Sequence, residues 1–563
     1  MKNKIILIVL MTLGFLLPYN ALAITYDTVD TGEKFVEALN QGKNVKLSNN
    51  IKVDTPITFN KKSTIDLNGY EVVFTYKNII TLMGGELNIT GSGKMSEEKP
   101  YFSPILLKGS ADKNDINYTV LTVGSNVTLQ GWAGLFIDQV NGKNKVKDSY
   151  GIVANIYGKL VSVPDASGDK GHGIYVNGNI KHKENCPIIN LYKDSSVSSK
   201  GEGIYSAGYS VWNISGTTIT GAGSGLAIKA GKFNINNASI FGTGPKIEGT
   251  YNGDGINPTG AAIQIESNNG YAGDINITID GGTYKSTKGN VIYHYLAKKN
   301  DADTVENKLK KIVINDGSFD GEVSLLDNDN LIINKGTFTT DSIKPYISSN
   351  SKILNNGSNY VVIDKNAKAI YKPSNIKLSN DISSDVVDKL NLSSLDNSKS
   401  GLVDAIKIDK LENITDASLI EVMIDTTLSK LDTKNNKVTY EIKPYYLVAG
   451  NLIGIIPNDA INGTVKIKVA VPNYINDTYA RVKHILNNKL LDEKAYKIKT
   501  ENGKKYITIE TNSFSTFELE FYTPLSINNP KTLDTLPSMI AILFGSLTVI
   551  GLTTILYKKR YDF

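Results

Sequence analysis

The residues with the clearest chemical potential lie in a glycine-rich stretch, DKGHGIYVNG, from Asp169 to Gly178. His172 stands between two glycines there, and Asp254 stands between two glycines in the later segment GDGIN. Hydrolysis of a polysaccharide needs two carboxyl groups beside the scissile bond, one as acid and one to activate water. Elimination needs a basic side chain that removes a proton next to a carboxylate. If the chain cleaves a polysaccharide, it must therefore supply either the two carboxyl groups or the basic side chain.

Neither set is complete in the sequence. Polygalacturonase-like enzymes carry Asn-Thr-Asp, Asp-Asp, Gly-His-Gly and Arg-Ile-Lys in that order, and this chain has no Asp-Asp pair and no Arg-Ile-Lys segment. The arginines are Arg481 and Arg560, so elimination would depend on a lysine. The densest aspartate run, DNDN at 327–330, is interpreted as a solvated turn rather than a calcium site. We therefore expect no catalytic residue, no metal ion and no cofactor, and hence no enzyme.

A repeat offers a structural role for the histidine. KGHGIY at 170–175 is matched by KGEGIY at 200–205, GSGLAI at 223–228 and GDGINP at 253–258. The residue between the two glycines is His172 in the first segment, and it is Glu202, Ser224 and Asp254 in the other three. We interpret the position as a turn in which the glycines allow a positive φ or close approach of the backbone, while the residue between them points to solvent.

Further repeats indicate the elements that hold these residues. ISGTTI at 214, INNASI at 235, IDGGTY at 279, INDGSF at 314 and INKGTF at 333 combine β-branched and aromatic residues with Gly, Asn and Asp. Such composition favours short strands joined by tight turns, and recurrence at a fixed period marks a stacked architecture. We predict an all-β protein with a right-handed parallel β-helix, in preference to hairpin-connected strands.

The strand pattern and turns resemble those of Gram-positive cell-surface proteins. STIDLNGYEVVF near the N-terminal end and the GGTY, DGSF and KGTF steps are similar to the pectate-lyase-like right-handed parallel β-helix that these proteins use as an adhesin. The resemblance implies a non-catalytic adhesin or display protein. A β-helix polysaccharide lyase or glycoside hydrolase and a passive structural spacer are the alternatives.

Aromatic side chains on strand faces are the candidate ligand contacts. An aromatic ring can stack on a sugar while nearby Asn and Thr side chains bind its hydroxyls, so host or environmental glycans, or proteins, are the expected partners. Each of these rings could equally lie in the core. The candidates are Tyr175, Tyr205, Tyr209, Trp212 and Tyr284.

Both ends of the chain carry export and anchoring signals. Residues 1–23 have the charged start, apolar run and small-residue end of a signal peptide, so cleavage is expected between Ala23 and Ile24. An uncharged span at 535–557 is long enough to cross a bilayer and precedes a basic tail at 558–563. We therefore expect the chain to be membrane-anchored at the cell surface.

A short motif precedes this span. Asn529, Pro530, Lys531 and Thr532, with the apolar span and basic tail, resemble the LPXTG-like sorting signal of Gram-positive surface proteins. The resemblance implies that a sortase attacks the carbonyl of Thr532 and joins it to peptidoglycan. Leu533 stands where the family usually has glycine.

Composition limits the remaining function classes. The net charge is only +5 from 61 basic and 56 acidic residues, two of them arginine, so nucleic-acid binding is not expected. One cysteine allows no intramolecular disulfide. The expected parts are a signal peptide (1–23), capping helix and first strands (24–60), β-helix (61–345), last coil and linker (346–401), β-sandwich stalk (402–522), polar spacer (523–534), transmembrane helix (535–557) and tail (558–563).

Overall fold

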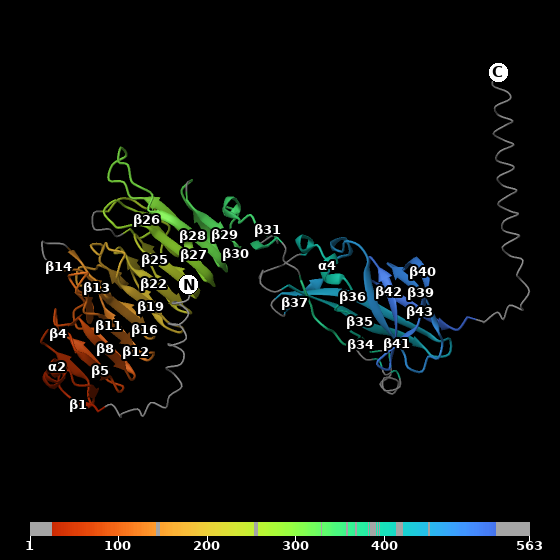
Figure 1. Cartoon of the computed structure of the whole chain (residues 1–563), viewed down its shortest axis with the longest axis horizontal. Helices are drawn as coiled ribbons and strands as arrows, with labels where there is room; N and C mark the ends of the chain where they lie inside the picture. The colour runs from red at the N-terminus through yellow and green to blue at the C-terminus, as the bar shows by residue number, and fades with distance from the viewer. Residues whose placement is uncertain are drawn as a thin grey trace, which may run out of the picture. The chain divides into compact units, whose positions relative to one another are not determined.

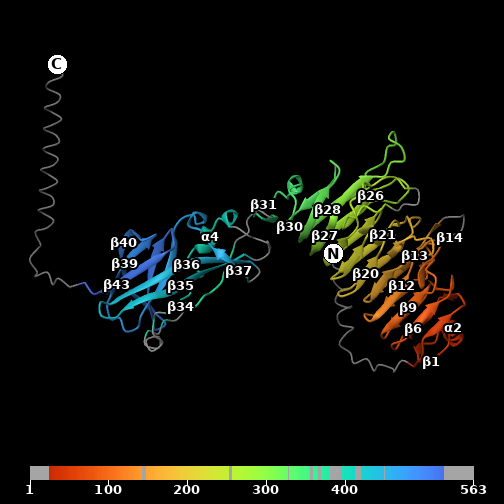
Figure 2. The same cartoon turned by 180° about the vertical axis from the view of Figure 1, so that it is seen from behind.

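The computed structural model describes residues 25–524, apart from 142–146, 253–256, 328, 356–358, 366–368, 381, 383–389, 391, 393–394, 412–419 and 449–450. The chain divides into two compact units, one formed chiefly by the chain up to Ile370 and the other chiefly by the chain after it (Figures 1 and 2). Both consist mostly of strands.

The first unit is built on a 30-stranded sheet whose strands pair in parallel from coil to coil. The pairings sort the strands into three columns, which are the faces of a parallel β-helix. The first column holds β1 (Asp27–Val29), β2 (Val45–Leu47), β5 (Lys62–Asp66), β8 (Gly85–Thr90), β11 (Thr119–Val123), β16 (Ile152–Ile156), β19 (Ile188–Leu191), β22 (Val211–Ser215) and β29 (Leu331–Ile333). The predicted parallel β-helix is confirmed, and its right-handed sense stays a prediction.

The second and third columns complete each coil. The second holds β3 (Ile51–Val53), β6 (Glu71–Phe74), β9 (Gly93–Glu97), β12 (Val127–Gly131), β17 (Lys159–Ser162), β20 (Ser196–Ser199), β23 (Thr218–Gly221) and β30 (Gly336–Phe338). The third holds β4 (Ile57–Phe59), β7 (Ile80–Met83), β10 (Ile105–Lys108), β13 (Ala133–Asp138), β18 (His172–Val176), β21 (Glu202–Ser206), β24 (Ser224–Ile228) and β26 (Ile263–Ser267). The long strands β25 (Lys232–Gly242), β27 (Ile275–Leu296) and β28 (Leu309–Ser324) bend from one column to the next.

Aliphatic side chains fill the interior of the coils. Ile174, Ile204, Leu226 and Ile263 lie in register on successive strands of the third column, and each is at most 1 % exposed. Burial of one such side chain contributes about 1.5–3 kcal/mol. Contacts between buried aliphatic side chains of successive coils therefore stabilise the β-helix along its length.

A helix covers the first coil. α2 (Gly32–Gln41) begins where the Thr31 side chain accepts a hydrogen bond from the Lys34 amide, and it ends at Gly42, whose φ is 76°. Phe35 and Leu39 on its inner face are fully buried. An amphipathic helix at this place shields apolar core residues and strand edges that would otherwise face water.

Short elements close the far end and branch from the coils. β31 (Ser351–Asn355) and β32 (Tyr360–Asp364) pair antiparallel, and β32 also pairs antiparallel with β30. β14 (Val140–Asn141) and β15 (Lys147–Asp148) form a separate two-stranded sheet, and η2 spans Lys344–Tyr346.

The second unit contains two mainly antiparallel sheets. One comprises β33 (Ile370–Tyr371), β34 (Ile376–Leu378), β35 (Ile420–Asp432), β36 (Lys437–Val448), β37 (Asn451–Ile455), β39 (Tyr479–Leu486), β40 (Lys489–Lys497) and β43 (Thr516–Tyr522). The other comprises β38 (Val465–Val471), β41 (Lys499–Glu501) and β42 (Lys504–Thr511). Tyr440 on the first sheet is fully buried and donates a hydrogen bond to the Ala470 carbonyl on the second, at 2.9 Å. The helical turns are α4 (Leu402–Ala405), η3 (Ile408–Lys410) and η4 (Asn458–Ala460).

Within the residues described here, no helix is long and apolar enough to cross a membrane. The expected span at 535–557, the sorting motif at 529–532 and the cleavage point between Ala23 and Ile24 all lie outside the described residues. They stay predictions.

Candidate functional site

The repeat around His172 sets the register of three neighbouring strands. His172 pairs with Glu202, and Glu202 pairs with Ser224, as the matching of the repeats predicts. The fourth member, Asp254, lies outside the described residues. Leu226 on β24 pairs instead with Ile263 on β26, so β26 provides the next strand of this column.

The position shared by these residues is not a solvated turn, which corrects the sequence-based interpretation. His172 is 1 % exposed, Glu202 2 % and Ser224 fully buried, and all three lie in strands. Neighbouring side chains cover this outer face: the His172 ring packs against Trp132 and Tyr205, and Ser224 Oγ lies 3.3 Å from Thr259 Oγ1 in the chain between β25 and β26.

The second glycine of each repeat allows close stacking of the coils. A Cβ placed on Gly173 would lie 2.4 Å from the carbonyl oxygen of Gly203, and one on Gly203 would lie 2.6 Å from that of Gly225. Because no real Cβ approaches a backbone oxygen so closely, these positions require glycine. They fix His172 and Glu202 next to each other on the outer face.

Charged groups are buried in pairs on this outer face. His172 Nδ1 lies 3.0 Å from Glu202 Oε2, and Lys229 Nζ lies 2.6 Å from Glu266 Oε2. Glu266 also accepts a hydrogen bond from Tyr295 at 2.6 Å. Burial lowers the pKa of Lys229, and the nearby Glu266 and Glu202 carboxylates oppose that shift. The outer face therefore contains an enclosed layer of charged and polar groups.

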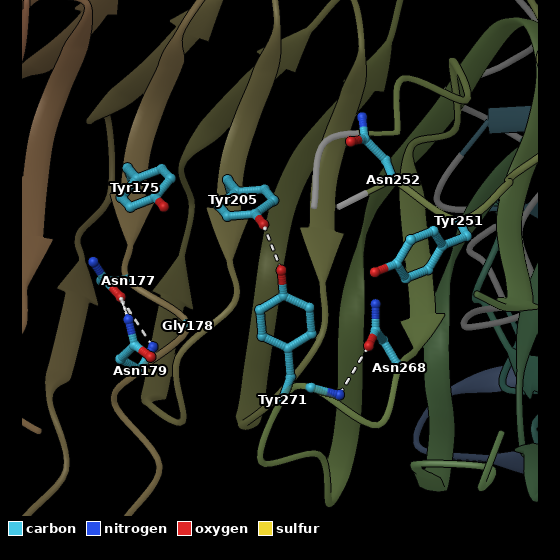
Figure 3. A pocket seen from close by; sticks show the side chains of 10 residues that line it. Tyr175, Asn177, Gly178, Asn179, Tyr205, Tyr251, Asn252, Asn268 and Tyr271 are labelled. Carbon is cyan, nitrogen blue, oxygen red and sulfur yellow. Dashed lines mark hydrogen bonds between the residues drawn. The ribbon is translucent and has the colours of Figure 1, made fainter. Parts of the chain in front are cut away.

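A cleft opens at the ends of the same strands (Figure 3). Its volume is about 330 Å³. Tyr175 and Tyr205 come from β18 and β21, while Tyr271 follows β26, and the hydroxyls of Tyr205 and Tyr271 are 3.5 Å apart. We call this hollow the tyrosine–asparagine cleft; it is lined by Tyr175, Asn177, Gly178, Asn179, Tyr205, Tyr251, Asn252, Asn268, Gly270 and Tyr271.

The tyrosines of the cleft are neutral hydrogen-bonding groups. Burial raises the pKa of Tyr175 to about 12, and it raises the pKa of Tyr205 well above its usual value, with Tyr271 adding to both shifts. At neutral pH both hydroxyls keep the proton. The half-buried Tyr175 can donate it to a ligand oxygen, whereas Tyr205 is only 2 % exposed and its hydroxyl lies against that of Tyr271. Together with the side-chain amides, they make the cleft a site for neutral polar groups presented on a flat, partly apolar ligand.

A second cavity, of about 320 Å³, lies where these strands begin. Glu202 lines it together with Asp169, and Lys170 and Lys200 are exposed at its edge. The other lining residues are mainly small or apolar: Gly171, Gly201, Ala222, Gly223, Gly244, Pro245, Ile247 and Pro258. We call this hollow the carboxylate cavity.

The five predicted ligand contacts lie in different environments in the structure. Tyr175 and Tyr205 line the tyrosine–asparagine cleft, whereas Tyr209 is half-buried with Lys183 Nζ 6.0 Å from its ring centre. Trp212 and Tyr284 are fully buried in the core, stacked on Phe233 and Phe319 with ring centres 5.7 and 4.6 Å apart. Those two cannot touch a ligand.

Sequence reasoning missed half of the aromatic cleft and a buried triad of polar groups. Tyr251 and Tyr271 lie in loops outside any repeat, and the only local sign was tyrosine beside asparagine, as in TYN and NNGY. In DNDN, Asp329 is not solvated: its side chain is buried and lies 2.6 Å from His294 Nδ1, while His294 Nε2 lies 2.8 Å from Ser267 Oγ. No cavity described above reaches Ser267.

No metal centre is evident at these hollows. Within residues 25–524, gaps apart, no group of three or more His, Cys, Asp or Glu side chains is arranged to hold a metal ion.

The comparisons with known proteins identify no family for this chain. No protein-family model and no curated protein sequence matches the chain. Among solved structures, the chain is similar to the enzymatically active domain of tailspike protein 4 of bacteriophage CBA120, with 10 % identity and a TM-score of 0.27. The match covers 88 % of this chain and 64 % of the tailspike chain.

The sequence-based expectation that the chain is not an enzyme is contradicted. It rested only on sequence motifs that are missing from the chain. The absence of the polygalacturonase motifs excludes one arrangement of catalytic residues, and a β-helix can carry a site on other residues of its faces. The non-catalytic interpretation is therefore withdrawn.

Proposed function

We propose that the first unit binds glycan chains in the tyrosine–asparagine cleft. The observation that carries this proposal is the joint lining of one hollow by four tyrosines and four asparagines. Aromatic rings pack against the C–H faces of sugar rings, and amide and hydroxyl groups bind the sugar hydroxyls. A passive spacer would not need such a hollow.

The test measures glycan binding by the full chain in detergent, first on a glycan array and then by titration of the best ligand. Tyr251 is 41 % exposed, so Tyr251→Ala removes a cleft ring without opening the core. We expect about tenfold weaker binding, which corresponds to about 1.4 kcal/mol.

The matched control is Tyr157→Ala. Tyr157 is 39 % exposed and stacks on Tyr192 on another face of the β-helix, outside the cleft. Unchanged affinity is expected for this variant. Equal losses in both variants, or no glycan bound by the wild-type chain, would refute the proposal.

Cleavage of the bound glycan is the second candidate function, in the class of β-helix lyases and hydrolases. A specific observation favours hydrolysis: two acidic residues, Asp169 and Glu202, line one cavity. Elimination has less support, because the lysine nearest the cleft rings, Lys229, is fully buried and paired with Glu266.

The location of the protein is a separate part of the proposal. We propose that the signal peptide exports the chain and that the apolar span holds it at the surface of a Gram-positive-type cell, by the membrane or, through Thr532, by the wall. The charge pattern around residues 535–557 and the motif at 529–532 support this location.

A further inference from the structure

Aromatic side chains continue from the tyrosine–asparagine cleft along the outer face of the third column. Phe136 lies in register with Tyr175, and their ring centres are 4.5 Å apart. The Trp132 ring centre is 5.8 Å from that of Tyr175, and the Phe102 ring centre is 5.7 Å from that of Phe136. The tyrosines of the cleft are therefore one end of a longer row of rings.

Two exposed tyrosines extend this row at its far end. Tyr101 packs edge-on against Phe102 with ring centres 4.4 Å apart, and Tyr76 packs edge-on against Tyr101 at 5.3 Å. Tyr76 is 49 % exposed and Tyr101 is 38 % exposed. Lys77 Nζ lies 5.0 Å from the ring centre of Tyr76 and 4.6 Å from that of Tyr101, which holds the two rings together. We call the row outside the cleft the aromatic track; it consists of Tyr76, Tyr101, Phe102, Trp132 and Phe136.

The aromatic track crosses several coils of the β-helix. Tyr76, Tyr101 and Trp132 lie in the chain that leads into β7, β10 and β13, which pair in that order. Tyr175 and Tyr205 continue the row on β18 and β21, the next two strands of the column. Neighbouring strands are about 4.8 Å apart, so the four steps from β7 to β21 span about 19 Å. The row is therefore several times longer than one sugar ring.

A buried carboxyl group fixes the backbone of the track. Glu97 is 7 % exposed, and its oxygens accept hydrogen bonds from the backbone amides of Tyr101, Phe102 and Trp132, at 3.4, 3.2 and 3.4 Å. One side chain thus joins the chain before β10 to the chain before β13. Because the backbone that carries these rings is held in place without a ligand, binding requires little further ordering of the protein.

We propose that the first unit binds a linear glycan along the aromatic track, with one part of the bound segment in the tyrosine–asparagine cleft. This inference rests on the proposed recognition of glycans by the cleft, and it identifies the ligand as a polymer of several sugars rather than a terminal sugar. The rings of the track contact the C–H faces of successive sugars, while the sugar hydroxyls on the open side stay in water. Trp132 and Phe136 contact Tyr175 directly, so track and cleft form one continuous surface, which favours the same kind of ligand on both.

The test compares the affinity of the full chain, in detergent, for short and long oligosaccharides. The probes are the disaccharide and the hexasaccharide of the cellulose, chitin, laminarin and amylose series, together with the same two lengths of any other glycan that the array identifies. If the ligand lies along the track, the hexasaccharide should bind at least about tenfold more tightly than the disaccharide.

Tyr101→Ala removes an exposed ring of the track and leaves the cleft unchanged. We expect it to weaken binding of the hexasaccharide about tenfold and to leave the affinity for the disaccharide as it is, because a disaccharide is short enough for the cleft alone. Tyr76→Ala should act in the same direction. Tyr251→Ala, which changes the cleft itself, should weaken binding of both lengths.

The matched control is again Tyr157→Ala. Tyr157 is 39 % exposed, almost the same as Tyr101, and stacks on Tyr192 on another face of the β-helix. Both affinities should stay unchanged in this variant. A loss of hexasaccharide affinity as large as that in Tyr101→Ala would contradict a ligand on the track.

Three further results would overturn the inference and leave the binding proposal intact. They are equal affinity of the wild-type chain for the two lengths, an unchanged affinity for the hexasaccharide in Tyr101→Ala, and equal weakening of both lengths in that variant. A wild-type chain that binds no glycan of either length would overturn both proposals.

Discussion

Lys229 shows how a charged residue is kept inside the outer layer of a β-helix. Its ammonium group is fully enclosed, lies 2.6 Å from Glu266 Oε2, and is 4.9 Å from the ring centre of Tyr271. Removing one partner of such a pair leaves the other charge buried without compensation, which usually destabilises a protein by about 3–5 kcal/mol. The pair is thus a point where a single substitution has a large effect.

We predict that Lys229→Met lowers the free energy of unfolding of the first unit by about 3 kcal/mol or more. Adding Glu266→Gln should recover part of this loss, because the neutral amide removes the unpaired charge and its one oxygen can still accept the hydrogen bond from Tyr295. Denaturant unfolding of the wild-type, single and double variants measures both effects.

The control is the exposed pair of Lys62 and Glu86, whose side chains are 76 % and 36 % exposed. Lys62→Met should change the free energy of unfolding by less than about 1 kcal/mol. A double variant of Lys229 and Glu266 less stable than the single Lys229 variant would contradict this account of the buried pair.

At the scale of the element, glycine sets how closely the coils of the third column approach. The predicted register of His172, Glu202 and Ser224 is correct because the requirement for glycine is local: the distance from Cβ to the next backbone is fixed by the strand itself. The burial of these residues could not be predicted, since the side chains that cover them, such as Trp132 against His172 and Thr259 against Ser224, come from other parts of the sequence.

The sequence predicts the direction of some aromatic side chains but not of others. In VWNIS, Trp212 has the same parity as Ile214, and both point into the core, so alternation alone indicates its burial. Tyr284 follows two glycines of positive φ, Gly281 and Gly282, where the strand bends and the alternation restarts. Its place depends on stacking with Phe319 on the next coil.

Gly203→Ala tests the role of glycine in the element. The added Cβ would lie 2.6 Å from the backbone oxygen of Gly225, so the coils must shift, and we expect a loss of about 1–3 kcal/mol in the free energy of unfolding. Gly454→Ala is the comparison, because its Cβ would meet only the Tyr446 ring, at 3.4 Å. Thermal unfolding with equal midpoints for the two variants would show that close approach of the coils is not the constraint.

At the scale of the whole molecule, the sequence predicts the repeated β-helix but not the cleft that is assembled on it. Composition and repeats predict the β-helix because each coil must bury apolar side chains at equivalent positions. The stacked core from Leu47 to Phe338 contains such side chains in coil after coil. The tyrosine–asparagine cleft is not repeated: Tyr251 and Tyr271 reach it from separate loops. A site assembled from loops of different coils leaves no periodic sign in the sequence.

The two ends of the chain carry the last prediction, which concerns attachment. The uncharged span at 535–557 with its basic tail predicts retention at the membrane, and the motif ending at Thr532 predicts transfer to the wall. Leu533 is a bulky group where sortase substrates usually present glycine, so steric hindrance should slow cleavage after Thr532.

We expect mass spectrometry of the protein from its native cells to find an N-terminus at Ile24 and a mixture of chains that end at Thr532 and at Phe563. Leu533→Gly should shift this mixture toward Thr532, whereas Thr532→Ala should leave only the chain ending at Phe563. An unchanged mixture in both variants would show that this motif does not direct attachment.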